Sequence, residues 1–313
     1  MSAGAPSVDV TSTPLERPLV LGGSGLVGGA FYRALRGRGH AVRGTFHTRP
    51  ASGLDPLDLA GDTAAYLETV GPSIVILASA LTHVDYCETH PEETRARNVD
   101  ALEPIVGWCA SRKVPLVFFS TDYVFDGAAG PYTEDAPPRP INVYGRSKLE
   151  GERRVGALAR YAVLRITNVF DVGHDTKNFL HRCVEHLRDR RPLVVPDDQW
   201  ATPTSAAWLA TQALDLIARG ALCGPDGPRT LHVACDDLVS RVEFARRVAE
   251  RLGADASLIE GRSTESLGQA APRPRRGGLH NDLLKRLLRV DSLPLDAALT
   301  EVLPRIRALY AAR

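Results

Sequence analysis

The sequence is poor in cysteine, carries almost no net charge and contains no long apolar run. Its five cysteines are odd in number and scattered, with no C-x-x-C pair, which argues against a disulfide framework and against a zinc site. We therefore expect no bound metal, and reduced thiols in a cytoplasmic protein. The formal net charge of +1 over 313 residues gives no global field that would favour nucleic acid or an anionic membrane.

No apolar run approaches the roughly 20 residues that span a membrane. Residues 1–16 are mostly Ser, Thr, Pro and other small types without a hydrophobic signal core, so we predict a disordered tail there. The rest of the chain is long enough to bury a large core, as one composite unit or as two domains.

The first structured segment is predicted to be a strand, a glycine-rich turn and a helix. Pro18–Leu21 is a short apolar run, and glycines follow it at positions 22, 25 and 28 before a helical pattern begins. This spacing lets the backbone turn tightly, approach a pyrophosphate and aim helix N–H groups at it, although a merely tight turn fits the same triplet. Its place after the first strand favours dinucleotide binding. The predicted cofactor contacts are Gly22, Ser24, Gly25, Leu26, Val27 and Gly28.

The second predicted strand, residues 41–47, ends in basic rather than acidic side chains. An NAD enzyme commonly places an acid here for the ribose hydroxyls. This chain has His47 and then Arg49, and a ribose 2′-phosphate would be bound by Arg49 and by Arg43. We therefore expect NADP (NADPH) rather than NAD, with a solvated basic turn as the alternative.

Two buried strands are predicted next, on either side of a helical stretch at residues 91–111. The first, residues 73–80, is a continuous apolar run typical of a parallel strand covered on both faces, and small residues at its end leave room for a cofactor. The second, residues 114–119, is followed by a polar segment at the edge where open α/β sheets bind ligands. The residues that follow these strands are Ala78, Ser79 and Ala80, and then Ser120, Thr121, Asp122 and Tyr123.

Tyr144 and Lys148 are four residues apart, so on a helix they share one face. A phenol has an ordinary pKa of about 10, and we expect the Lys148 charge to lower it. The pair suits a general acid that protonates a carbonyl oxygen while hydride reaches its carbon. Thr121 or Ser120 would donate a hydrogen bond to that oxygen, although loop capping explains either hydroxyl equally well. Tyr-x-x-x-Lys arises often by chance, so the motif gains its meaning from the cofactor loop and hydroxyls that precede it.

Strands that alternate with helices predict an α/β protein with a Rossmann-type, doubly wound parallel sheet over residues 17–170. The later segments lose that alternation. We expect residues 171–313 to form a smaller C-terminal domain that is mainly substrate-binding, with some segments returning to the first domain. The remaining predicted elements are a strand at 161–166 and helices at 204–217, 239–252, 282–288 and 295–310.

Motifs spread over nearly the whole chain carry a family resemblance. They are Val20–Gly28, Thr82–Glu88, Asn98, Ser120–Gly127, Pro140–Lys148, Asp198–Gln199, Thr202–Thr204 and Arg273–Pro274. Together they resemble the dTDP-4-dehydrorhamnose reductases and their deoxysugar-forming relatives among the extended short-chain dehydrogenase/reductases. The resemblance implies NADPH-dependent reduction of a 4-keto-6-deoxy nucleotide sugar to the 4-hydroxy sugar.

The resemblance also implies roles for single residues. Thr121, Tyr144 and Lys148 would be the catalytic triad, and Asp58 and Leu59 would lie near the adenine. The residues that would surround a nucleotide-sugar substrate are Thr82, Val84, Asp85, Ser120, Asp122, Tyr123, Asn168, Trp200 and Arg273, the last near its phosphates.

Departures from the family pattern leave the exact sugar and the product stereochemistry open. Leu77, Leu81 and Gly277 replace residues that the family usually has near the sugar pocket. The arginine- and alanine-rich composition suits a high-GC organism. Such organisms make many unusual deoxysugars, so a rhamnose precursor is only one possible substrate. The sequence also leaves open whether the protein forms a homodimer and whether a divalent ion bridges its subunits.

Two rival functions are considered. The first is a related epimerase or 4,6-dehydratase, but a dehydratase typically has Asp-Glu after the catalytic Thr, and here Tyr123 follows Asp122. The second is a non-catalytic NADP-binding protein similar to the regulatory subunit of methionine adenosyltransferase. That protein shares the fold and many of the motifs, and the presence of Tyr144 and Lys148 does not exclude it.

Overall fold

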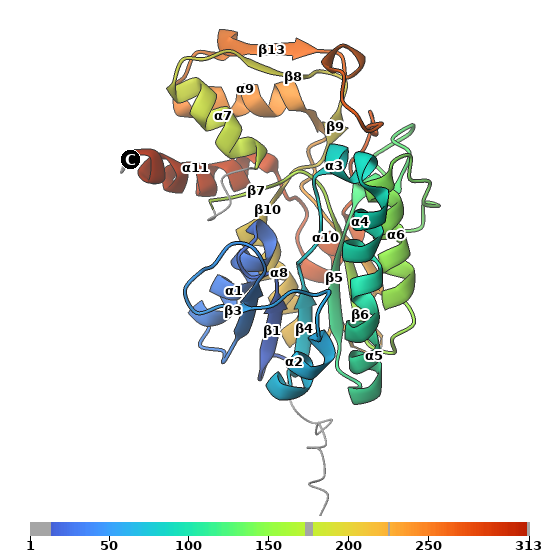
Figure 1. The fold of residues 1–313 in the computed structure, drawn as a ribbon. Helices are drawn as coiled ribbons and strands as arrows, with labels where there is room; N and C mark the ends of the chain where they lie inside the picture. The colour runs from blue at the N-terminus through green and yellow to red at the C-terminus, as the bar shows by residue number, and fades with distance from the viewer. Residues whose placement is uncertain (1–13, 173–177, 225, 312–313) are drawn as a thin grey trace, which may run out of the picture.

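The computed structural model describes residues 14–172, 178–224 and 226–311. Within them the main sheet consists of β1 (Pro18–Leu21), β2 (Arg43–Phe46), β3 (Asp55–Pro56), β4 (Ile74–Leu77), β5 (Leu116–Thr121), β6 (Tyr161–Ile166) and β11 (Thr230–Val233). All seven strands are parallel, in the order β11-β6-β5-β4-β1-β2-β3 (Figure 1). The strand order reverses between β1 and β4, and ligands bind at the carboxyl ends of the strands at such a switch point.

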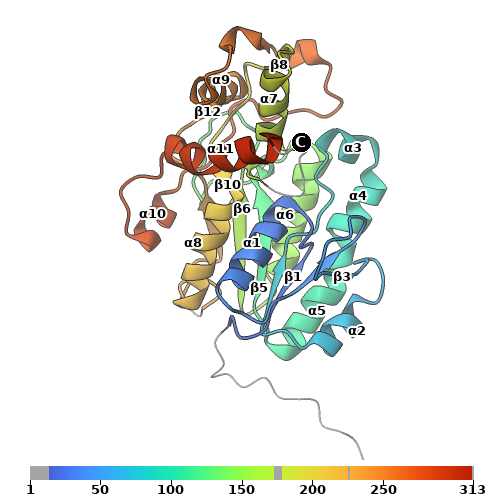
Figure 2. The same ribbon diagram turned by 90° about the vertical axis from the view of Figure 1, so that its left-hand side faces the viewer.

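Helices cover both faces of the main sheet. Those of one face are α1 (Leu26–Gly37), α8 (Ala206–Ala218) and α10 (Asp282–Leu288). Those of the other are α2 (Thr63–Val70), α5 (Glu103–Arg112) and α6 (Val143–Val155), with α3 (Val84–Thr89) and α4 (Pro91–Asn98) packed against α6. Figure 2 shows α1 and α8 side by side, although Gly37 and Ala206 are 169 positions apart in the sequence.

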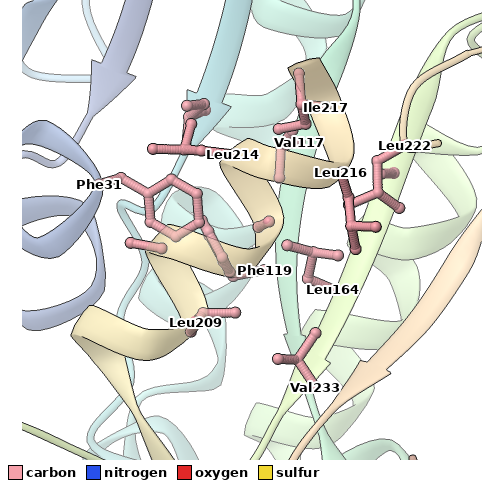
Figure 3. Close-up of a cluster of buried hydrophobic side chains, with 14 of the residues drawn as sticks. Phe31, Val117, Phe119, Leu164, Leu209, Leu214, Leu216, Ile217, Leu222 and Val233 are labelled. Carbon is pink, nitrogen blue, oxygen red and sulfur yellow. The ribbon is translucent and has the colours of Figure 1, made fainter. Parts of the chain in front are cut away.

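The strands of the main sheet are apolar throughout because both of their faces are buried. In β1, Val20 packs into the core beneath α1 and α8, whereas Leu19 and Leu21 pack into the core on the opposite face. Phe31 and Phe119 meet edge to face in the first core, with 5.2 Å between ring centroids. Figure 3 shows this core, to which α8 contributes a row of leucine and isoleucine side chains.

A second, smaller hydrophobic core lies above the main sheet in Figure 1. Phe170 and Phe244 pack edge to face within it, 5.4 Å apart at their centroids. Its helices are α7 (Phe179–Arg188), α9 (Arg241–Leu252) and α11 (Leu295–Ala311). Three two-stranded pairs accompany them: β7 (Val169–Phe170) with β10 (Thr204–Ser205), β8 (Leu193–Pro196) with β13 (Ile259–Arg262), and β9 (Trp200–Ala201) with β12 (Val239–Ser240).

The structure confirms the predicted strands at 18–21 and 161–166 and corrects several other boundaries. The strands predicted at 41–47 and 73–80 are shorter, being β2 and β4, and the strand predicted at 114–119 is β5, which starts and ends two residues later. Its shift places Thr121 inside the sheet rather than after it.

The predicted helix at 91–111 is wrong as one element, because the α-helix is interrupted between Asn98 and Glu103. Pro104 lies in the first turn of α5. Backbone N–H groups in a first turn have no hydrogen-bond partner within the helix, so proline, which lacks an N–H, is tolerated there. The helices predicted from 204 and 239 begin two residues later. Ser205 and Ser240 instead cap α8 and α9 with their side chains and belong to short strands.

Residues 14–16, predicted as the end of a disordered tail, pack onto the fold. Leu15 is only 3% exposed and joins the core beneath α1. The Ser73 hydroxyl donates to the Pro14 carbonyl at 2.8 Å. Residues 1–13 of the predicted tail lie outside the described residues. Among the helices that the structure describes, none is both long and apolar enough to cross a membrane.

Candidate active site

The turn between β1 and α1 has no room for side chains at two of its glycines. A Cβ on Gly28 would lie 2.3 Å from the Gly22 carbonyl oxygen, and one on Gly22, whose φ is +89°, would lie 2.8 Å from the Ser79 nitrogen. Gly25 precedes α1 without a side-chain cap, and the first turn holds no acid. The first N–H groups of α1 are therefore available to an anion, and this cradle fits a dinucleotide pyrophosphate. Ser24, Leu26 and Val27 lie half-buried in the same turn.

The segment after β4 lies against the glycine turn and is tied to α6. A Cβ on Gly28 would come within 3.1 Å of the Ala78 side chain, and Ser79 and Ala80 follow, half-buried. Asn98 exchanges two hydrogen bonds with the backbone of Leu81, at 2.7 and 2.9 Å, and donates a third to Ser147 on α6 at 3.1 Å. One buried amide thus fixes the cofactor side of the cleft to the helix that carries the Tyr-x-x-x-Lys motif.

The carboxyl end of β2 presents His47 and Arg49, both exposed. His47 Nε2 lies 3.6 Å from a carboxylate oxygen of Asp58. Asp58, which we expected near the adenine, therefore lies beside the basic turn, and Leu59 after it is half-buried. Arg43 does not belong to this site, contrary to our expectation. It is the first residue of β2, at the end of the strand away from the ligand edge, and its guanidinium is paired with Asp55.

Thr121 and Tyr144 come together at the carboxyl end of β5. Thr121 is the last residue of β5, and Tyr144 lies in the first turn of α6, which Asn142 caps by accepting from the Gly145 N–H at 2.8 Å. Burial raises the pKa of the Tyr144 phenol above its ordinary value, and the nearby Thr121 hydroxyl acts in the opposite direction. The prediction that this pKa is lowered is wrong for the protein alone, because burial raises it and the charge of Asp122 acts in the same direction. The phenol is therefore protonated, as a proton donor must be.

Lys148 lies one turn further along α6, almost completely buried at 4% exposure. Its ammonium sits 4.0 Å from the centre of the Phe118 ring and forms no ion pair or hydrogen bond with any residue that the structure describes. Burial lowers the pKa of Lys148 to about 7, while the charge of Glu152 acts to raise it. A buried ammonium without a partner fits the hydroxyls of a bound cofactor ribose.

Asp122 and Ser120 flank Thr121 and are also buried. Asp122 accepts hydrogen bonds from Thr167 at 2.7 Å, from the Gly278 N–H at 3.4 Å and from Thr121 at 3.2 Å. Burial raises the pKa of Asp122, and these hydrogen bonds oppose the increase. The Ser120 hydroxyl is buried without a hydrogen-bond partner among the described residues, so it can bind a ligand group.

Tyr123, next in the chain, packs its ring edge-on against Tyr144, with 5.9 Å between centroids. Asn168 follows β6 with a φ of +42°, a left-handed conformation that asparagine tolerates, and it lines a small cavity together with Pro203 and Arg241. Arg241 was not predicted from the sequence. Of the other residues expected near the substrate, Val84 is the first of α3, Thr82 is exposed just before it, and Trp200, 39% exposed, lies in β9.

Asp85 and Arg273 form an ion pair that spans the two ends of the sequence. The Arg273 guanidinium donates to Asp85 at 2.8 Å and is only 7% exposed, and the second Asp85 oxygen accepts from the Ala271 N–H at 3.0 Å. Arg273 therefore already has an anionic partner. The predicted contact between Arg273 and substrate phosphates would have to compete with this pair.

A family model described as "RmlD substrate binding domain" matches residues 16–308. The chain belongs to the RmlD family. Among RmlD-like relatives, the probable low-salt glycan biosynthesis reductase Agl14 of Haloferax volcanii is 36% identical, over 83% of this chain and 88% of its own. The dTDP-4-dehydrorhamnose reductase of Streptomyces griseus is 31% identical, over 94% of this chain and 96% of its own.

The RmlD family resemblance extends to a second kind of protein and to solved structures. The methionine adenosyltransferase 2 subunit beta of Xenopus tropicalis is 30% identical, over 85% of this chain and 80% of its own. A crystal structure of dTDP-4-dehydrorhamnose reductase from Bacillus anthracis in complex with NADP superposes with a TM-score of 0.82 at 25% identity. That match covers 93% of this chain and 99% of the other, so the fold is shared over nearly the whole length.

Proposed function

We propose that this RmlD-family chain reduces the keto group of a 4-keto-6-deoxy nucleotide sugar, such as dTDP-4-dehydrorhamnose, to a hydroxyl with NADPH. The observation that carries the proposal is the proximity of Thr121 to Tyr144, one helical turn from the buried Lys148 ammonium, which has no polar partner among the described residues. A hydroxyl, a protonated phenol and a buried cation at the ligand edge of a parallel sheet form the set that carbonyl reduction needs.

Each side chain has a role in the proposal. Tyr144 donates its proton to the carbonyl oxygen, and its raised pKa keeps that proton in place until negative charge develops on the oxygen. Thr121, whose hydroxyl donates to Asp122 in the protein alone, would turn that hydroxyl toward the same oxygen and stabilise the charge. Lys148 binds the ribose hydroxyls of the cofactor. When bound, NADPH supplies the hydride that reaches the keto carbon.

The cofactor assignment has two supports. The turn at Gly22 to Gly28 fits a pyrophosphate, and the reductase of known structure from Bacillus anthracis is a complex with NADP. Preference for NADPH over NADH would come from Arg49, which is exposed at the carboxyl end of β2. Guanidinium groups bind phosphate through charge-assisted hydrogen bonds that a ribose hydroxyl does not provide.

A second candidate is a non-catalytic, NADP-binding regulatory protein. It is favoured by the 30% identity to methionine adenosyltransferase 2 subunit beta. The two candidates differ in a direct assay. Purified protein is incubated with NADPH and a panel of dTDP-4-keto-6-deoxy sugars, and the loss of reduced-nicotinamide absorbance is followed. A reductase consumes NADPH with at least one sugar, and a regulatory protein consumes none.

A further inference from the structure

Arg241 carries a positive charge that forms no ion pair with any described residue. It is the first residue of α9 and is half-buried, with its guanidinium carbon 4.7 Å from the centre of the Phe179 ring. Within residues 14–172, 178–224 and 226–311, its side chain forms no ion pair and no hydrogen bond. Burial lowers the pKa of Arg241, and the charge of Asp122 only partly opposes that decrease. A cation in the first turn of a helix is also disfavoured by the helix dipole.

Arg241 lies beside the candidate catalytic loop. It lines a small cavity with Asn168, which follows β6, and with Ser240. Its charge also acts on Tyr123 and Asp122, the two residues that follow Thr121. The Tyr123 ring in turn packs against Tyr144, the proposed proton donor. The diphosphate of a nucleotide sugar is on C1, across the ring from the C4 keto group, so its partner should lie near Tyr144 but not against it.

A second cation strengthens the case for an anionic ligand here. Arg182 of α7 is close enough to lower the pKa of Arg241 further, so a second positive charge lies in the same part of the molecule. Among the described residues, the Arg182 side chain donates only to the backbone carbonyl of Val194, at 3.1 Å. Arg273 offers no such charge, because Asp85 neutralises it. The uncompensated positive charge in this cleft is therefore at Arg241.

We propose that Arg241 binds the diphosphate of the nucleotide-sugar substrate. This assignment rests on the proposed function for the identity of the ligand. The diphosphate carries two negative charges next to the anomeric carbon, and a guanidinium presents an N–H fork to such oxygens. The contact with the Phe179 ring restricts the Arg241 side chain before the ligand arrives, which lowers the entropic cost of binding.

The test is calorimetric titration with dTDP, which carries the diphosphate but no sugar. Loss of one charged contact weakens binding by about tenfold or more, so Arg241→Met should raise the dissociation constant of dTDP by at least that factor. Arg241→Lys keeps the charge without the planar fork, so its dissociation constant for dTDP should lie between those of the parent and Arg241→Met. This variant also shows whether the site accepts another side chain. Arg246→Met, an exposed arginine of the same helix, is the matched control and should bind dTDP like the parent.

Two further titrations assign the effect to the phosphates. Thymidine lacks phosphate, so its weak binding should be the same in the parent and in Arg241→Met. NADPH should bind both proteins equally, because its pyrophosphate belongs to the glycine turn after β1, and this control also shows that the variant is folded. An equal loss of thymidine binding in Arg241→Met would overturn the assignment to the diphosphate.

The outcomes separate this inference from the proposed function. If the parent reduces a keto sugar but Arg241→Met binds dTDP as tightly as the parent does, the inference is wrong and the reductase stands. If Arg241→Met loses dTDP while the parent reduces no sugar, Arg241 is a diphosphate ligand in a protein of another function. A parent that does not bind dTDP at millimolar concentration contradicts the inference.

Discussion

The Lys148 ammonium lies 4.0 Å from the centre of the Phe118 ring, on the face of β5 opposite the core that holds Phe119. A ring face attracts the cation but replaces only part of its lost hydration. Lys148 therefore keeps its charge at a cost, and burial lowers its pKa to about 7. Residues held in this way are typical of functional sites rather than of structural ion pairs.

The depressed pKa of Lys148 predicts a specific pH dependence of stability. Between pH 7 and its ordinary pKa of 10.5, the unfolded chain binds this proton and the folded chain does not, so the free energy of unfolding rises with pH in that window. Lys148→Met removes the effect. The difference between parent and variant, measured by denaturant unfolding without cofactor, should change by up to about 1.4 kcal/mol per pH unit above pH 7. A difference that is constant from pH 7 to 10 would contradict the buried, unpartnered lysine.

The glycine turn predicts that Gly28→Ala loses NADPH affinity, because its new methyl group would lie 2.3 Å from the Gly22 carbonyl oxygen and displace the turn. Gly37→Ala, in the same helix, is the control, since a Cβ there meets nothing within 4 Å. That change should leave NADPH binding as it is and raise the free energy of unfolding by about 0.5–1 kcal/mol. Fluorescence titration with NADPH measures both variants. Equal affinities would show that the cofactor does not use this turn.

The end of β2 predicts that the protein prefers NADPH to NADH and that Arg49→Ala shrinks the preference by about tenfold, the effect of one charged phosphate contact. Arg43→Ala is the matched control, because Arg43 is paired with Asp55 at the other end of the strand. It should keep the preference. Dissociation constants for both cofactors are measured for the parent and both variants, and a parent that binds NADH as tightly as NADPH refutes the assignment of Arg49.

Much of the fold and of the candidate site could be predicted because the relevant signals are local. The glycines at 22, 25 and 28 and the pair Tyr144 and Lys148 each sit in a single turn, so spacing alone places them. The depth at which they are buried is not local. For that reason the expected lowering of the Tyr144 pKa by Lys148 was wrong: burial acts on both groups and dominates.

Contacts between distant segments could not be predicted. The strand β11 and the helix α7 have no hydrophobic periodicity strong enough to predict them. The position of α8 against α1 depends on packing between distant segments, which the sequence does not show. Asp85 and Arg273 are 188 residues apart, so their pairing was invisible in the sequence. Arg241 follows a helix-capping serine and looks like an ordinary surface arginine until the fold brings it beside Tyr123.

Tyr123 follows Asp122 where a 4,6-dehydratase typically has a glutamate, which predicts that the protein accepts a ready-made keto sugar and does not generate one. Burial raises the pKa of Tyr123, so this phenol does not act as a base near neutral pH. Incubation with dTDP-glucose and NAD or NADP should leave the sugar unchanged by mass and chromatography. A 4-keto-6-deoxy product would replace the reductase by a dehydratase.

The central claim is that the Tyr144 hydroxyl delivers the proton in the reduction of a keto sugar. Tyr144→Phe removes only that hydroxyl. With NADPH and the best dTDP-4-keto-6-deoxy sugar of the panel, the loss of nicotinamide absorbance should slow by about two to four orders of magnitude in the variant, while the dissociation constant for NADPH stays within about twofold of the parent value. A Tyr144→Phe protein that reduces the sugar at the parental rate would contradict the account and make Tyr123 the next proton donor to examine.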